Sequence, residues 1–114
     1  MKRFPSLKKN SDFQAVYRTG KSLSNRQLVM YVKQTDHTGT RIGISVSKKV
    51  GNSVVRHHLT RLIRESFRLN EDMLQTGLDI VVVARAAAKE SEYKTIERAF
   101  LHLCGLHNIF RESK

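Results

Sequence analysis

Residues 41–70 read RIGISVSKKVGNSVVRHHLTRLIRESFRLN, and the hydrophobic period changes within this stretch. Over 41–47, large apolar side chains alternate with glycine and serine, which predicts a strand. The face formed by Gly43, Ser45 and Ser47 is either exposed or the floor of a groove, because small residues let a ligand approach the backbone. From Ser53 to Asn70 the period becomes helical, which predicts the longest helix of the chain.

The predicted helix over 53–70 separates apolar from cationic side chains. At about 100° per residue, one face carries Val55, Leu59, Leu62, Ile63, Ser66 and Leu69. The opposite face carries His57, Arg61, Arg64 and Arg68, with Arg56 beside them. A solvated helix normally intersperses Glu with Arg, but Glu65 is the only acid here and is expected off the cationic face. Guanidinium groups bind phosphate in a bidentate manner, so the pattern favours nucleic-acid binding over a merely solvated face.

Charge is concentrated in the first part of the 114-residue chain, whose formal net charge is +11. Residues 1–68 hold 15 Lys and Arg against 3 Asp and Glu, whereas residues 69–114 hold 6 against 7. Such asymmetry indicates a polyanionic partner. Helices that read DNA bases usually mix Asn, Gln and Ser with Arg, so the nearly all-Arg face favours RNA or backbone contacts.

The other predicted elements surround this stretch. Ser11 and Gln14 form a capping box, so a first helix should begin at Ser11 and end near Arg18, with Gly20 just after it. The remaining predictions are a strand over 23–34, a turn over 36–39 that joins it to 41–47 as a hairpin, a strand over 78–84, a short turn over 86–88 and a helix over 92–106. The strand over 78–84 is apolar on both faces and is expected at the centre of the sheet.

This order predicts a single-domain α+β sandwich with a mixed sheet over residues 1–114. The basic lead 1–9 and the tail 108–114 are expected to be flexible. The single cysteine, Cys104, excludes an internal disulfide and a Cys-based zinc site, and it is expected to be a buried apolar residue. No signal peptide or membrane span is recognisable, so we expect a cytoplasmic protein without a membrane partner.

Histidine chemistry is not expected from this chain. His57 and His58 are neighbours on a helix and point about 100° apart, so they cannot flank one phosphate as acid and base. The other histidines show no metal-ligand spacing with one another, and His107 is expected to be a packed residue of the last helix. The sequence therefore predicts no catalytic residue and no metal site within the protein.

Aromatic side chains indicate a second surface. Phe13 and Tyr17 are four residues apart on the first helix, and Val29 and Tyr31 are two apart on a strand, so each pair shares a face. Aromatic rings beside a glycine–serine floor suit stacking of single-stranded bases, although Phe13 is about equally well explained as a core residue.

The segment from Lys48 to Arg68 resembles the signature of the bacterial ribonuclease P protein subunit, whose usual form is KxGNAVxRNRxKRLIR. Arg56, Arg61 and Arg64 match residue for residue, whereas His57, His58 and Thr60 stand where the family usually has Asn, Arg and Lys. Residues 7–17 resemble the family's first helix and residues 25–31 its first long strand. Together these segments cover most of residues 7–84.

The resemblance implies a protein that binds a large catalytic RNA and precursor tRNA, with no obligate protein partner. The complex would remove the 5′ leader of the tRNA, with Mg²⁺ held mainly by the RNA. It also implies a fold resembling a domain of a small-subunit ribosomal protein, with a left-handed strand–helix–strand crossover. The residues expected to bind the RNA subunit are Arg56, His57, Arg61, Arg64 and Arg68. The residues expected to form a leader cleft between the first helix and the sheet are Phe13, Tyr17, Val29, Tyr31, Lys48 and Lys49.

Two other functions remain open at this point. A general or ribosome-associated RNA-binding module would bind RNA without a role in tRNA maturation. A DNA-binding regulator would prefer duplex DNA of defined sequence.

Overall fold

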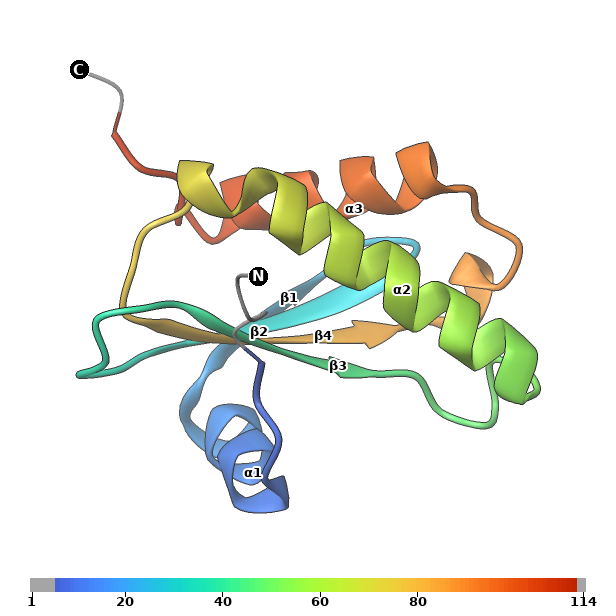
Figure 1. The fold of residues 1–114 in the computed structure, drawn as a ribbon, viewed down its shortest axis with the longest axis horizontal. Coiled ribbons are helices and arrows are strands. Elements are labelled where there is room, and N and C mark those ends of the chain that lie inside the picture. The colour runs from blue at the N-terminus through green and yellow to red at the C-terminus, as the bar shows by residue number, and fades with distance from the viewer. Residues whose placement is uncertain (1–5, 113–114) are drawn as a thin grey trace, which may run out of the picture.

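A four-stranded sheet divides the molecule into two unequal layers, in a computed structural model that describes residues 6–112. One helix covers one face of the sheet, and the two other long helices cover the opposite face (Figure 1). In chain order the elements are α1 (Asn10–Thr19), β1 (Lys21–Ser24), β2 (Leu28–Gln34), β3 (Arg41–Ser45), α2 (Ser53–Asn70), η1 (Glu71–Met73), β4 (Leu78–Ala84), η2 (Ala86–Ala88) and α3 (Tyr93–Leu106). The predicted α+β sandwich is therefore confirmed.

The sheet is mixed, with the strand order β1-β2-β4-β3. β4 pairs antiparallel with β2 and parallel with β3, so the predicted central position of residues 78–84 is confirmed. The predicted hairpin between residues 23–34 and 41–47 is wrong, because β4 lies between β2 and β3. A strand that is apolar on both faces must be covered on both, which places β4 inside the sheet and β3 at its edge.

The predicted strand over 23–34 is two strands. Residues 25–27 turn the chain between β1 and β2, which pair antiparallel. The Asn25 side chain holds this turn, since its Oδ1 accepts hydrogen bonds from the amides of Gln27 at 3.3 Å and Leu28 at 3.0 Å. An asparagine that binds the backbone two and three residues ahead is a turn former, and this local signal was missed.

The main hydrophobic core lies between the sheet and the pair α2 and α3. Phe67 of α2 and Phe100 of α3 meet there edge to face, with ring centroids 6.5 Å apart. The layer under α1 is much smaller, and its buried members are Leu7, Val16 and Val81. Most apolar burial, and hence most of the hydrophobic stabilisation, is therefore on the α2–α3 side.

The two ends of α1 differ from the prediction. The helix begins at Asn10 because the carbonyl of Lys9 accepts hydrogen bonds from the amides of Asp12 and Phe13, so Ser11 lies inside the first turn and caps nothing. Gly20 follows the helix with an extended backbone rather than a left-handed one. A Cβ at Gly20 would lie 2.6 Å from the carbonyl oxygen of Val16, so close approach explains this glycine.

Some residues near the described ends of the chain are packed, while the flexibility expected of 1–9 and 108–114 stays a prediction. Leu7 is buried, and its amide donates to the carbonyl of Ile42 at 2.8 Å. Ile109 is buried as well, and Phe110 forms a bridge with Leu74. Residues 1–5 and 113–114 lie outside the described residues. None of the helices within 6–112 has both the length and the hydropathy needed to cross a bilayer.

Candidate nucleic-acid interface

The long helix α2 presents the cationic side chains away from the core. Asn52 caps it, because its Oδ1 accepts a hydrogen bond from the amide of Val55 at 3.0 Å. The fully buried side is formed by Leu59, Ile63, Ser66 and Phe67. The residues predicted to bind the RNA subunit, here called the cationic ridge, lie on the remaining surface: Arg56, His57, Arg61, Arg64 and Arg68.

The buried side of α2 is rotated relative to the predicted one. Leu69 was expected in the core but is 55% exposed, whereas Phe67 is fully buried. The helix turns this way because Phe67 packs against Phe100 of α3. The prediction that apolar and cationic residues occupy different sides of the helix is confirmed, since His57, Arg61, Arg64 and Arg68 are all exposed.

One arginine of the ridge is paired with an acid. Arg68 Nη2 donates to Glu65 Oε2 at 3.0 Å, and Arg68 Nε donates to Oε1, a pairing that the helical projection did not predict. The hydrogen bond lowers the pKa of Glu65 and raises that of Arg68. Within residues 6–112, no carboxylate lies at ion-pair distance from Arg56 or Arg61. The ridge therefore keeps at least two guanidinium groups that an anion can approach.

The strand register sets two rows of side chains that cross all four strands on the sheet face under α1. The first row runs through Ser24, Val29, Val83 and Ser45, and the second through Ser22, Tyr31, Val81 and Gly43. The predicted shared face of Val29 and Tyr31 is thus confirmed. Glycine and serine occupy the edge strand β3 in both rows, as its alternation indicated.

A groove of about 440 Å³ opens between α1 and this face. It is lined by Lys8, Asn10, Phe13, Tyr17, Ile44 and Ser45. Phe13 also packs on the backbone, since a Cβ at Gly43 would lie 2.6 Å from its ring. Tyr17 rests edge to face on Tyr31 with centroids 4.9 Å apart. Both aromatic residues of α1 therefore pack against the sheet and also line the groove. This double role explains why the sequence did not decide whether Phe13 is a core residue or a binding residue.

The other residues predicted for this cleft do not line the groove. Val29 and Tyr31 belong to the same sheet face, and Tyr31 supports Tyr17 from below. Lys48 and Lys49 are exposed in the turn between β3 and α2. Lys8 and Asn10 line the groove and were missed, because they precede the predicted start of the first helix.

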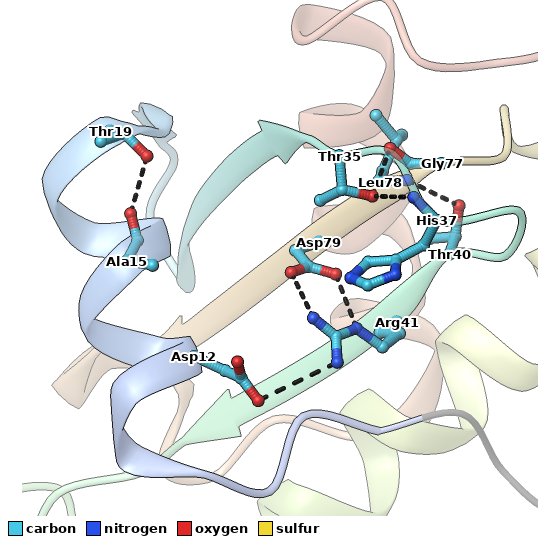
Figure 2. A network of polar contacts seen from close by, with 10 residues as sticks. All are labelled: Asp12, Ala15, Thr19, Thr35, His37, Thr40, Arg41, Gly77, Leu78 and Asp79. Carbon is cyan, nitrogen blue, oxygen red and sulfur yellow. Dashed lines mark hydrogen bonds and ion pairs between the residues drawn. The ribbon is translucent and has the colours of Figure 1, made fainter.

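A polar network that reaches the first turn of α1 was also missed (Figure 2). Arg41 donates to both carboxylate oxygens of Asp79, from Nε at 2.9 Å and from Nη2 at 2.7 Å. Its Nη1 lies 3.9 Å from Asp12 Oδ2 of α1. Hydrogen bonding to Asp79 is the main cause that raises the pKa of Arg41. The pairing depends on the register of β3 against β4, across 38 residues of chain, so no local pattern could reveal it.

The remaining nucleophilic and titratable candidates have packing roles. Cys104 is buried, and burial raises the pKa of its thiol to about 12, as expected of an inert core cysteine. Burial lowers the pKa of His107, whose Nε2 lies 2.9 Å from the carbonyl oxygen of Met30. The part of the chain that the structure describes contains no group of three His, Cys, Asp or Glu side chains placed to hold a metal ion.

Comparison with known proteins gives one consistent result. The sequence model of the family described as Ribonuclease P matches residues 1–107. The ribonuclease P protein component of Lachnoclostridium phytofermentans is 54% identical over 109 residues, which cover 96% of this chain and 94% of that protein. The structure of the Staphylococcus aureus RNase P protein has a TM-score of 0.87 at 37% identity and covers 96% of this chain and 100% of its own. The Thermotoga maritima RNase P protein has a TM-score of 0.80 at 31% identity, covering 86% of this chain and 93% of its own.

Proposed function

Because this chain belongs to the ribonuclease P protein family, we propose that it assists a catalytic RNA in removing the 5′ leader from precursor tRNA. Its place as a protein component of the endoribonuclease follows from the family. The assignment of the RNA subunit to one surface of the protein and of the leader to another is our proposal. The substrate, a newly made tRNA precursor, implies the bacterial cytoplasm as the place of action.

The observation that carries the proposal is the cationic ridge on α2. Arg56 and Arg61 have no carboxylate partner within residues 6–112, and their helix is anchored by four buried residues. Guanidinium groups on a rigid helix suit the phosphates of a folded RNA, because their fork geometry matches phosphate oxygens. The ridge, His57 included, binds the RNA subunit.

The groove beside α1 binds the leader. Phe13 and Tyr17 offer aromatic rings to unpaired bases, and such stacking contributes about 1–3 kcal/mol per base. Lys8 lines the groove, and Lys48 and Lys49 lie exposed at the start of α2. These cations attract the leader backbone without reading its sequence.

The hydrolysis belongs to the RNA subunit with Mg²⁺. The carboxylates of Asp12 and Asp79 do not offer a divalent ion a free donor set, because both face the guanidinium of Arg41. The groove itself offers an ammonium, an amide and the two hydroxyls of Tyr17 and Ser45 rather than paired carboxylates. The protein residues bind and orient RNA, and none of them is assigned a proton-transfer step.

Reconstitution at limiting Mg²⁺ tests the proposal. The protein, a bacterial ribonuclease P RNA and precursor tRNA are combined, and the protein should increase leader cleavage. Arg61→Gln should weaken assembly with the RNA, whereas Arg98→Gln, which removes one exposed arginine from α3, should not. A protein that binds RNA but leaves cleavage unchanged would be a general RNA-binding module. Preference for a defined DNA duplex would indicate a DNA-binding regulator.

A further inference from the structure

We infer that Asp12, Arg41 and Asp79 position α1 on the sheet and thereby set the geometry of the leader groove. The inference rests on the proposed function of that groove. It assigns a positioning role to three residues that do not line the groove.

The buried member of the network requires a partner. Asp79 is 5% exposed in the central strand β4, and a buried carboxylate is costly unless it is paired and hydrogen-bonded. Arg41 supplies two hydrogen bonds from the edge strand β3. The pair therefore fixes the guanidinium at a defined place on the sheet face.

The third member connects this fixed group to α1. Asp12 Oδ2 lies 3.9 Å from Arg41 Nη1, on the side of the guanidinium that Asp79 does not use (Figure 2). The side chains of Asp12 and Arg41 are about equally exposed, at 31% and 30%. Asp12 thus contacts a charged group whose own position is set by the sheet.

α1 buries fewer residues than α2, so each of its contacts with the sheet contributes a larger share of its attachment. Val16 is the only residue of α1 that is fully buried, whereas α2 buries four residues. Before the helix, the amide of Leu7 binds the carbonyl of Ile42 at 2.8 Å. Within residues 6–112, the pair of Asp12 with Arg41 is the ion pair that joins α1 to the sheet, and it adds a charged contact to the packing of Phe13 and Tyr17.

The network and the groove share α1 and β3. Asp12 faces Arg41, the next residue Phe13 packs over Gly43, and Ser45 farther along the strand lines the groove. Arg41, Gly43 and Ser45 lie on one face of β3, because alternate residues of a strand face the same way. A change of α1 orientation at Asp12 therefore moves the ring of Phe13 at the groove wall.

Asp12→Asn provides a test, because two explanations predict opposite changes in the affinity for leader-bearing precursor tRNA. It removes a negative charge, so electrostatics alone would tighten binding of any RNA. Loss of positioning would instead weaken binding of leader-bearing precursor tRNA, by about three- to tenfold if the groove loses most of one stacking contact. Affinity for mature tRNA and for the RNA subunit should not fall. The affinities are measured with the holoenzyme reconstituted from this protein and a bacterial ribonuclease P RNA.

Three further variants separate positioning from other effects. Asp36→Asn removes the same charge from an exposed loop residue and should not weaken leader binding. Ser11→Asp combined with Asp12→Asn restores an acid to the first turn of α1, and should stay weak if the contact with Arg41, rather than the helix dipole, is what matters. Asp12→Glu should recover part of the affinity, because it retains a carboxylate.

The possible failures can be told apart. If the wild-type holoenzyme binds precursor and mature tRNA equally, the proposed leader groove is wrong. If the wild type prefers the precursor and Asp12→Asn retains the same preference, the proposal that the groove binds the leader is supported, but the positioning role of Asp12 is overturned. A variant that weakens all RNA ligands equally also overturns it. A melting temperature close to that of the wild type shows that the variant is folded.

Discussion

The cationic ridge and the leader groove are built on helices that are anchored very differently. The ridge lies on an 18-residue helix with four buried residues, whereas the groove lies beside a 10-residue helix with one. Ridge residues point away from the core, so replacing them should affect binding more than folding. The aromatic residues of the groove also pack against the sheet, so replacing them should affect both.

The largest expected effect is on the anchor of the ridge. Phe67→Ala removes a fully buried ring from the contact between α2 and α3, and should lower the free energy of unfolding by about 3–5 kcal/mol. Val16→Ala, the corresponding truncation under α1, removes two methyl groups and should cost roughly 1.5–2 kcal/mol. Urea denaturation measures both values. Equal losses would show that the two helices are anchored equally well.

A smaller effect is expected at the floor of the groove. Gly43→Ala places a methyl group 2.6 Å from the ring of Phe13, so the ring must move. The variant should lose about 1–3 kcal/mol of stability and bind leader-bearing tRNA more weakly than wild type. Binding to the RNA subunit should be retained, because α2 lies on the other side of the sheet. Equal loss of both affinities would contradict the separation of the two surfaces.

The salt dependence of binding to the RNA subunit should differ between two arginines of the ridge. Arg61→Gln should flatten the slope of log affinity for the RNA subunit against log salt by about one unit, or about 0.7 for a single-stranded contact. Arg68→Gln should flatten it less, because Glu65 already partly neutralises Arg68. The matched replacement Arg98→Gln on α3 serves as the control. A larger change for Arg68 than for Arg61 would show that Glu65 orients Arg68 for RNA rather than competing for it.

The smallest effect concerns pH. Burial lowers the pKa of His107, so the unfolded chain takes up a proton at higher pH than the folded chain. The stability from neutral His107 is complete above the unfolded pKa, and is lost as the pH falls through that value towards the folded pKa. Denaturation at pH 7.5 and pH 5.5 should show this loss, and His107→Gln should reduce it. An unchanged pH dependence in the variant would assign the loss to other groups.

The sequence predicted the elements whose signals are local. The strand over 78–84 and its central place followed from its being apolar on both faces, and α2 followed from its helical period. The hairpin failed because strand neighbours are chosen by burial across the whole sheet, not by distance along the chain. The rotation of α2 depends on the meeting of Phe67 with Phe100, which a single-helix projection does not contain.

In the candidate site, too, features set by local spacing were predictable, whereas contacts made by long side chains or between distant strands were not. The positions of the ridge arginines followed from helical spacing alone, and the groove aromatics from i,i+4 and i,i+2 spacing together with the family resemblance. The salt bridge of Arg68 with Glu65 was missed because long side chains reach beyond their own angular sector. The contact of Arg41 with Asp79 was missed because it exists only once two distant strands are in register.

The placement of α1 and α2 on opposite faces of the sheet has a topological consequence. The sheet lies between the cationic ridge and the groove, so a single RNA strand that contacted both would have to pass around an edge of the sheet. The edge of the sheet on this side is strand β3, and the turn between β3 and α2 carries Lys48 and Lys49. Two separate RNA segments could instead be held on the two sides at once, with the thickness of the sheet and its side chains acting as a fixed spacer between them.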